Sequence, residues 1–313
     1  MGATGPRRQS KTSTPAPQAT PRPVSPAAPL PPLISTDELQ RLLDLPRLRI
    51  FDTTVHLAPK PGGGYVVASG RADYEAGHLP GAGFIDVGDE LSDPDHALRY
   101  MLPPAALFAK RMSGWGVGPG TRVVLYNAGP TWWATRVWFM LREYGFDAAQ
   151  VLDGGLDKWK LEGRPLERAP CAYPPARFEA GPRRGLFVGK EQVLQAVRRR
   201  DQHLVNALSP ESFSGRSGGY GRPGRIAGSV NLFAKDLLDP VTQAFLPLPE
   251  LRRRLEARGL LDGLPVIAYC GGGISATTDA FALHLLGHDS VAIYDGSMNE
   301  WGPDAALPME CDA

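Results

Sequence analysis

Short apolar runs, separated by amphipathic stretches and glycine-rich turns, organise most of the chain after its first 32 residues. A short apolar run bounded by turn residues is typical of a buried strand, and apolar residues that recur three or four positions apart are typical of a helix. Strands that alternate with helices predict a parallel sheet flanked by helices, which is an α/β fold. The expected strands are 49–52, 121–126, 149–152, 203–206, 265–269 and 290–294, and the expected helices include 39–43, 133–141 and 276–286.

These elements form an internal repeat, because the same order of strand, turn, helix and strand occurs in both halves of the chain. Tyr126 and Asp153 lie 27 residues apart in the first half, and Tyr269 and Asp295 lie 26 residues apart in the second. A tryptophan follows each aspartate by six residues. The segments 77–81 and 224–228 also match each other upstream of these elements. The repeat predicts two structural units of one design.

The expected domain organisation follows from this repeat and from the proline-rich stretches around it. Residues 1–32 are rich in Pro, Ser, Thr and Ala without apolar periodicity, which predicts a disordered tail. We expect an N-terminal domain at 33–168, a proline-rich linker at 169–185 and a C-terminal domain at 186–313. Each domain is expected to hold a mostly parallel sheet flanked by helices.

Composition narrows the classes of function. The chain carries 34 Lys and Arg against 33 Asp and Glu, so its net charge of +1 favours neither nucleic acid nor a membrane surface as a partner. No apolar run reaches the ~18 residues that a membrane span needs. The basic N-terminus has no apolar segment behind it, which argues against a secretory signal. A mitochondrial transit peptide stays open, although the many prolines favour a cytoplasmic protein with a disordered tail.

The most informative segment for function runs from Tyr269 to Ser275 and joins a strand to a helix through Cys270 and three glycines. Glycines let consecutive N–H groups turn toward one point, and the start of a helix adds a partial positive charge there. Such a place stabilises a thiolate, or a persulfide anion formed on it, without a metal. The alternative is a buried structural cysteine, which would not need three adjacent glycines. The other two cysteines, Cys171 and Cys311, have no such loop, and no cysteine spacing indicates a metal site.

The motifs together resemble tandem-domain rhodanese sulfurtransferases of the thiosulfate and 3-mercaptopyruvate type. The resemblance covers about residues 33 to 313 and rests on the strand–Cys–glycine loop–helix unit together with four segments of the first half. These four segments are Gly77-His-Leu-Pro-Gly-Ala82, Met101-Leu-Pro103, Asp153-Gly-Gly155 with Trp159, and Arg164-Pro-Leu-Glu167. The resemblance implies that the C-terminal domain alone carries the catalytic cysteine. In agreement with this, Asn127 occupies the position in the first repeat that Cys270 occupies in the second.

The resemblance also assigns expected roles at the site. Cys270 is the catalytic residue, and the loop Gly271, Gly272, Gly273 and Ile274 binds the substrate. This loop resembles the mercaptopyruvate type, which makes Ser275 a catalytic candidate for moving a proton to the leaving enolate; its alternative role is a helix N-cap. His78 matches a substrate-facing histidine, although it could simply bond within its turn.

The chain departs from the family where an aspartate and a substrate-binding arginine are common, since Asn206 and Leu208 stand there. Three arginines in the next glycine-rich loop offer replacement guanidinium groups for an anion, the alternative being an ordinary solvent loop. We include them among the expected substrate-binding residues, which adds Arg216, Arg222 and Arg225.

The expected reaction is ping-pong transfer of a sulfane sulfur through a Cys270 persulfide, from thiosulfate or 3-mercaptopyruvate to cyanide or a thiol. The resemblance implies no metal or cofactor, small-molecule partners, and a monomer or weak dimer. One alternative is a cysteine phosphatase-like enzyme, which needs an arginine where Ala276 stands. The other is a rhodanese-like module that binds partners without catalysis.

Overall fold

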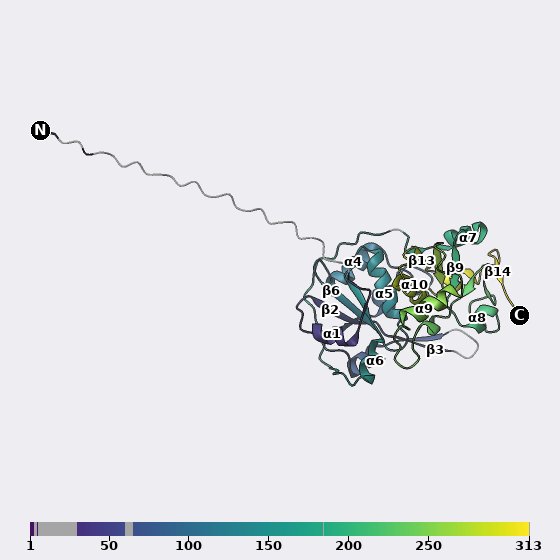
Figure 1. Cartoon of the computed structure of the whole chain (residues 1–313), viewed down its shortest axis with the longest axis horizontal. Coiled ribbons are helices and arrows are strands. Elements are labelled where there is room, and N and C mark those ends of the chain that lie inside the picture. The colour runs from purple at the N-terminus through teal and green to yellow at the C-terminus, as the bar shows by residue number, and fades with distance from the viewer. Residues whose placement is uncertain (3–4, 6–29, 60–64, 184, 313) are drawn as a thin grey trace.

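The structure, a computed structural model, describes residues 1–2, 5, 30–59, 65–183 and 185–312. The tail expected at 1–32 lies almost wholly outside these residues. The described chain forms two lobes, the first half of the sequence in one and the second half in the other (Figure 1). No helix in the described ranges is long and apolar enough to cross a membrane.

The first lobe is built on a sheet of five parallel strands in the order β1-β7-β6-β2-β5. The expected strands at 49–52, 121–126 and 149–152 are three of its members, and the two outer strands are shorter. The strands are β1 (Leu33–Ile34), β2 (Leu48–Asp52), β5 (Ala82–Phe84), β6 (Arg122–Tyr126) and β7 (Ala149–Leu152).

The second lobe repeats the same sheet in the order β11-β9-β12-β13-β8, again with every pair parallel. Its strands are β8 (Phe187–Val188), β9 (His203–Asn206), β11 (Val230–Asn231), β12 (Val266–Tyr269) and β13 (Val291–Tyr294). The matching strand orders confirm the predicted α/β fold with two units of one design. The expected domain boundaries at 168 and 186 stay predictions.

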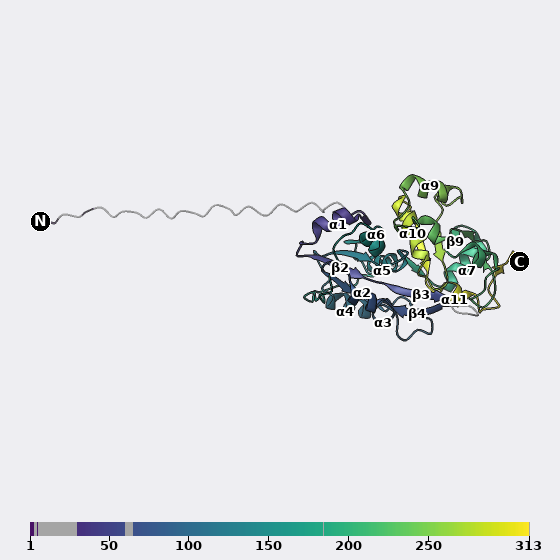
Figure 2. The same ribbon diagram turned by 90° about the horizontal axis from the view of Figure 1, so that it is seen from below.

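Helices cover both faces of each sheet, as the two views in Figures 1 and 2 show. In the first lobe they are α1 (Thr36–Leu42), α2 (Arg71–Ala76), α3 (Val87–Glu90), α4 (Ala105–Gly114), α5 (Trp132–Glu143) and α6 (Gly155–Leu161). In the second they are α7 (Lys190–Arg199), α8 (Pro210–Ser214), η1 (Ala234–Leu237), α9 (Leu248–Glu256), α10 (Ala276–Leu285) and α11 (Ser297–Trp301).

The repeated tryptophan explains the motif that ends each half. Trp159 and Trp301 are both fully buried. The Trp159 indole N–H donates to the Pro165 carbonyl at 2.8 Å, and the Trp301 indole N–H donates to the Pro308 carbonyl at 3.1 Å. A buried indole needs an acceptor for its N–H, so the tryptophan and the proline segment recur together.

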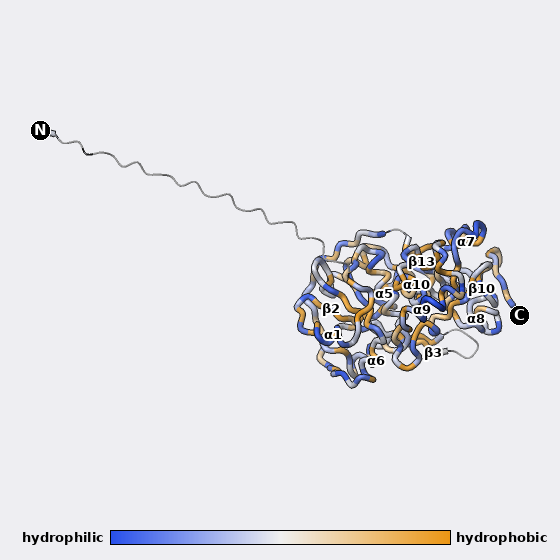
Figure 3. The backbone as a smooth tube through the Cα atoms, in the orientation of Figure 1, coloured by the Kyte–Doolittle hydropathy of each residue, from blue (hydrophilic) through white to orange (hydrophobic). Residues whose placement is uncertain are grey.

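Helices α5 and α10 hold the two lobes together. Each directly follows the central strand of its own sheet, and the two pack on each other between the lobes. The Thr135 and Thr277 hydroxyls are 2.7 Å apart across this contact, and the Trp138 ring meets the Phe281 ring edge-on. One hydrophobic cluster contains residues from both lobes. Figure 3 shows hydrophobic segments in this region and hydrophilic ones at α9. The lobes therefore share a core.

The proline-rich segment between the lobes follows the surface of the first lobe. Tyr173 donates from its hydroxyl to the Gly81 carbonyl at 2.5 Å, and its hydroxyl accepts from the Ile50 amide at 2.8 Å. Phe178 is buried in the shared cluster. These contacts fix the path of the chain from one lobe to the other.

Asp52 and Asn206 occupy equivalent ends of β2 and β9 and make the same turn. The Asp52 carboxylate accepts from the Thr54 amide at 2.9 Å, and the Asn206 side-chain oxygen accepts from the Leu208 amide at 2.9 Å. Burial raises the pKa of Asp52 to about 6. Asn206 thus keeps the turn without a charge, so a negative charge is not needed at this position.

Asp52→Asn is therefore expected to stabilise the protein at neutral pH. Because the folded pKa lies above the ordinary value of 3.8, the stability that Asp52 contributes falls as pH rises from about 4 to about 6. Above pH 6 the buried charge costs about 3 kcal/mol. Urea unfolding should show a gain for Asp52→Asn that grows across this window, whereas the exposed Asp201→Asn shows none. A gain that does not change with pH would contradict the prediction.

Candidate active site

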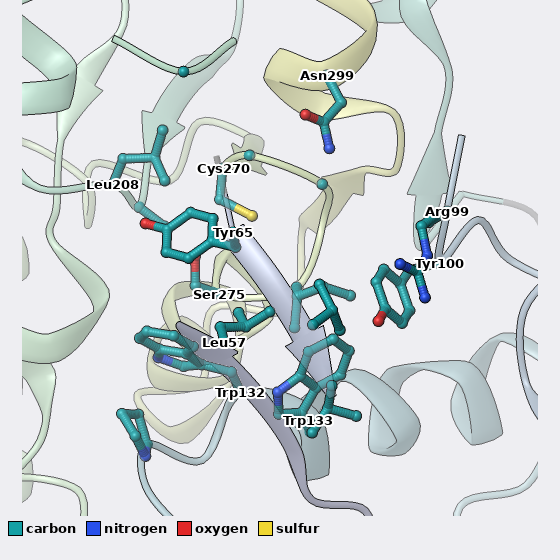
Figure 4. Close-up of a pocket in the computed structure, with 18 of the residues that line it drawn as sticks. Leu57, Tyr65, Arg99, Tyr100, Trp132, Trp133, Leu208, Cys270, Ser275 and Asn299 are labelled. Atoms are coloured by element: carbon teal, nitrogen blue, oxygen red, sulfur yellow. The ribbon is translucent and has the colours of Figure 1, made fainter. Parts of the chain in front are cut away.

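A cavity of about 880 Å³ lies between the two lobes, with Cys270 in its wall (Figure 4). Residues of the first lobe supply one side, mainly from the hairpin of β3 (Val55–Pro59) and β4 (Tyr65–Ser69), the segment 97–100 and the start of α5. The second lobe supplies the glycine loop, the segment that follows β9 and part of α8. The cavity between the two lobes thus holds the cysteine.

Cys270 directly follows β12, the central strand of the second sheet, and is 2% exposed. Its sulfur points into the cavity among the labelled side chains of Figure 4. Its amide donates to the Ser297 hydroxyl at 3.1 Å, and its carbonyl accepts from the Met298 amide at 3.0 Å. Hydrogen bonds to Ser297 and Met298 therefore fix the backbone of the cysteine, and only its thiol faces the cavity.

The loop after the cysteine leaves its hydrogen-bond donors free. Among the described residues, no acceptor is bonded to the amides of 271 to 275. Buried N–H groups are nearly always paired, so a run of five unused donors beside a thiol is suited to an anion. The helix α10 begins at Ala276 and adds its positive end.

Two of the three glycines are required by close approaches. Gly273 has a φ of +72°, and a Cβ there would lie 2.7 Å from the Asp295 carbonyl oxygen. A Cβ on Gly271 would lie within 2.4 Å of the Tyr220 hydroxyl. Gly271, Gly272 and Ile274 line the cavity. Gly273 is not among the lining residues and shapes the loop from behind.

A buried ion pair between the two lobes supports this loop. Arg136 of α5 is fully buried, and its guanidinium donates to the Gly273 carbonyl at 3.2 Å and to the Tyr100 carbonyl at 2.7 Å. The same guanidinium lies 2.7 Å from the Asp295 carboxylate, which also accepts from the Leu102 amide at 2.7 Å. The first lobe thereby holds the position of the cysteine loop in the second.

Ser275 lines the cavity next to the loop, and Figure 4 shows its hydroxyl below Cys270. Its side chain does not cap α10, and within the described chain its hydroxyl has no hydrogen-bond partner. Ser275 therefore occupies the N-cap position of α10 without using its hydroxyl there, and the hydroxyl is free for a substrate.

Asn127 takes the place of Cys270 in the first lobe, directly after β6. Its side chain turns into its own loop, where its amide donates to the Ala128 and Pro130 carbonyls, both at 2.8 Å. Its oxygen accepts from the Ala134 amide at 3.0 Å. The first loop is thus filled by its own residue, and in the part of the chain that the structure describes only the second lobe carries a cysteine loop of this kind.

The structure corrects the placement of His78, which does not reach the cavity. Its ring is fully buried in the first lobe, 2.8 Å from the Tyr74 carbonyl and 3.1 Å from the Ala169 carbonyl. Its backbone pairs with Glu167. Arg225 holds the equivalent position in the second lobe, where it pairs with Glu310. Both residues tie the end of a lobe to its body.

The three loop arginines are corrected in the same way, because each bonds away from the cavity. Arg216 is exposed and donates to the Ser214 hydroxyl at 3.1 Å. Arg222 donates to the Gly302 carbonyl at 2.9 Å, and Arg225 lies 2.8 Å from the Asp312 carboxylate. This loop contributes Gly219 and Tyr220 to the cavity instead.

Two cations that the sequence analysis passed over do line the cavity, Arg99 and Lys235. Neither forms an ion pair with a described residue. Arg99 comes directly before Tyr100 and the Met101-Leu-Pro103 motif, a position that could have drawn attention to it. Lys235 belongs to η1, and nothing in its sequence context indicates the cavity.

Tyr220 and Tyr65 bring phenol groups to the cavity beside the cysteine. Burial raises the pKa of Tyr220, and the negative charge of a Cys270 thiolate raises this pKa further. The Tyr220 phenol therefore stays protonated at neutral pH and is a donor near the sulfur.

Comparison with known proteins agrees with this arrangement. A family model described as "Rhodanese-like domain" matches residues 35–162 and 190–304. Human 3-mercaptopyruvate sulfurtransferase is 32% identical over 280 residues, which cover 86% of this chain and 91% of that protein. Thiosulfate sulfurtransferase of Bos taurus is 34% identical over 263 residues, 82% of this chain and 85% of that protein.

A crystal structure gives the same result in three dimensions. SseA from Escherichia coli, described as a 3-mercaptopyruvate sulfotransferase, superposes with a TM-score of 0.76 and 28% identity. The match covers 86% of this chain and 99% of SseA. The strand order, the repeated motifs and these matches lead to one conclusion: the chain belongs to the rhodanese family and carries two rhodanese-like domains in tandem.

Proposed function

We propose that this protein is a sulfurtransferase that moves a sulfane sulfur from thiosulfate or 3-mercaptopyruvate to cyanide or a thiol through a persulfide on Cys270. The observation that carries the proposal is the Cys270 thiol, which faces the inter-lobe cavity beside five unused backbone amides. The relatives are sulfurtransferases over most of the chain, which supports the same reaction.

In the loading step, the Cys270 thiolate attacks the outer sulfur of thiosulfate. The new S–S bond forms as the bond to the sulfonate sulfur breaks, and sulfite leaves with the electron pair. The product is a Cys270–S–S⁻ anion, which the loop amides and the start of α10 stabilise. With 3-mercaptopyruvate, the thiolate attacks the donor sulfur and the C–S bond breaks with its electron pair on carbon. The pyruvate enolate so formed accepts the proton of the donor thiol and leaves as pyruvate. Ser275 stands where it can relay that proton.

The proposal is tested by steady-state transfer from thiosulfate to cyanide in the full chain, measured as thiocyanate. We expect double-reciprocal plots with parallel lines when the two substrates are varied, the signature of ping-pong transfer. Intersecting lines, or no thiocyanate at all, would overturn the proposed function.

The phosphatase alternative is weaker because Ala276, where that chemistry needs an arginine, is buried at the start of α10. An inert protein that accepts no sulfur would favour the binding-module alternative.

Ser275→Ala should separate the two donors. Its hydroxyl is free at the cavity, and the proton transfer that it would assist occurs only with 3-mercaptopyruvate. We expect kcat with 3-mercaptopyruvate to fall about 10²-fold while the thiosulfate rate stays within about threefold. Equal losses with both donors would indicate that the serine merely shapes the loop.

Leu208→Arg should improve the use of 3-mercaptopyruvate. Leu208 is half-buried, lines the cavity, and stands where the resemblance places a carboxylate-binding arginine. A guanidinium there can form charge-assisted hydrogen bonds to the donor carboxylate, so kcat/KM should rise about tenfold. Leu208→Lys is the control, because lysine brings a positive charge without the planar, bidentate donor geometry of a guanidinium. No gain with either residue would contradict a carboxylate site at this position.

We further propose that the partners are small sulfur donors and acceptors and that the protein works as a monomer or weak dimer without nucleic acid or membrane. A net charge near zero supports the absence of such polyanionic partners. A cytoplasmic location is our proposal, and a mitochondrial one stays the alternative because a related plant enzyme is mitochondrial. Sedimentation of the purified chain and imaging of a C-terminally tagged chain test these two points.

A further inference from the structure

The cavity is far larger than thiosulfate or cyanide requires. Cavities of roughly 300–1,000 Å³ hold whole organic ligands, and this one measures about 880 Å³. Its size therefore indicates that one of the two substrates of the ping-pong cycle has a sizeable body.

Several aromatic side chains line the cavity around the thiol. Tyr65, Tyr100, Trp132 and Trp133 are drawn around Cys270 in Figure 4, with Leu57 between them. Tyr65 is 46% exposed although it faces this space. Aromatic faces left open to water gain most from an apolar or aromatic ligand that covers them.

The charged side chains around the cysteine are basic. No aspartate or glutamate is among its described lining residues, whereas Arg99 and Lys235 stand unpaired at it. The Arg99 guanidinium lies 5.3 Å from the Tyr100 ring centre, and the Lys235 ammonium lies 5.8 Å from that of Trp132. His56, the third basic lining residue, is already paired with Asp73. A ligand is therefore expected to combine an aromatic body with an acidic group.

We propose that the sulfur acceptor is a small organic thiol with an aromatic body and one acidic group. This inference rests on the proposed function and names the substrate of its second step. The acceptor thiolate attacks the outer sulfur of the Cys270 persulfide, and the bond between that sulfur and Sγ breaks. The electron pair returns to Cys270, so a thiol and a persulfide exchange one sulfur without an oxidant.

The test uses two thiols that differ by a ring. The full-length protein is loaded with thiosulfate, freed of excess donor, and mixed with 4-(mercaptomethyl)benzoate or with 3-mercaptopropionate. Both carry a thiol on a CH2 group and a carboxylate, and because the benzylic thiol is the more acidic, each rate is divided by the thiolate fraction of that thiol at the assay pH. We expect the second-order rate of persulfide loss to be about tenfold or more higher with the ring-bearing thiol.

Variants locate the effect in the cavity. Tyr65→Ala together with Trp132→Leu should reduce the rate ratio of the two thiols to about threefold or less. Arg99→Gln together with Lys235→Gln should lower the rate with 4-(mercaptomethyl)benzoate about fivefold relative to uncharged 4-methylbenzyl thiol. Arg252→Gln, which removes an exposed arginine of α9, is the matched control and should change neither ratio.

The outcomes separate this inference from the proposed function. A protein that never takes sulfur from thiosulfate overturns both. A persulfide that cyanide discharges, but that reacts equally with the two carboxylated thiols or with neither, overturns only the acceptor proposal. A ring preference that persists in the Tyr65→Ala/Trp132→Leu variant also overturns it, because the ring would then bind elsewhere.

Discussion

Cys270→Ser is expected to lower thiocyanate formation about 10⁴-fold or more, the scale on which removal of a covalent nucleophile acts. A serine hydroxyl is not ionised at neutral pH and cannot carry a persulfide, although it leaves the surrounding structure unchanged. The measurement is the steady-state rate with thiosulfate and cyanide, alongside the thermal midpoint of unfolding to show that the variant is folded.

Cys171→Ser is the matched control for this result. Cys171 lies outside the cavity, and burial raises the pKa of its thiol, which opposes the reactive thiolate form. Its replacement should leave the rate within about twofold. A Cys270→Ser variant with a tenth or more of the wild-type rate, or a Cys171→Ser variant without activity, would contradict the assignment of the nucleophile.

Arg136→Met is expected to be the most destabilising single change at the lobe interface. It leaves the buried Asp295 carboxylate without its cation, and removing one member of a buried ion pair costs about 3–5 kcal/mol. It also frees the Gly273 carbonyl, so the cysteine loop loses its support from the first lobe. We expect a fall of roughly 6–20 °C in the thermal midpoint and a lower kcat.

Arg142, on the same helix, provides a control that compares an exposed ion pair with the buried one. Arg142 of α5 is partly exposed and pairs with the half-exposed Asp147 at 3.5 Å. Arg142→Met should therefore cost about 1 kcal/mol or less. Adding Asp295→Asn to Arg136→Met should recover part of the stability by removing the orphaned charge, but not the kcat, since the loop stays unsupported. Equal midpoints for Arg136→Met and Arg142→Met would refute the proposed role.

Periodicity and repetition predicted the parts of the fold that are buried on all sides. The central strands are continuous apolar runs, so their positions were readable, as was the helix that begins at Ala276. The two-residue strands β1 and β8 give no such signal. The β3–β4 hairpin was also missed, because its second strand is mostly exposed and lacks the pattern of a core strand. This hairpin nevertheless walls the cavity.

The nucleophile and its loop were predictable because the chemistry lies within seven consecutive residues. Arg136 was not, since its partners Gly273 and Asp295 are more than a hundred positions away and belong to the other lobe. His78 and Arg225 were misplaced for a related reason. A family motif led to the expectation that His78 faces the substrate, and a glycine-rich loop led to the same expectation for Arg225. These two instead fasten the ends of the two lobes through Glu167 and Glu310.

The most direct test is the mass of the Cys270 peptide after brief exposure of the full-length protein to thiosulfate and removal of the donor. The account predicts an added mass of about 32 Da, one sulfur atom, on the peptide that contains Cys270, lost again on addition of cyanide. A peptide of unchanged mass, or the added sulfur on Cys171 or Cys311 instead, would contradict it.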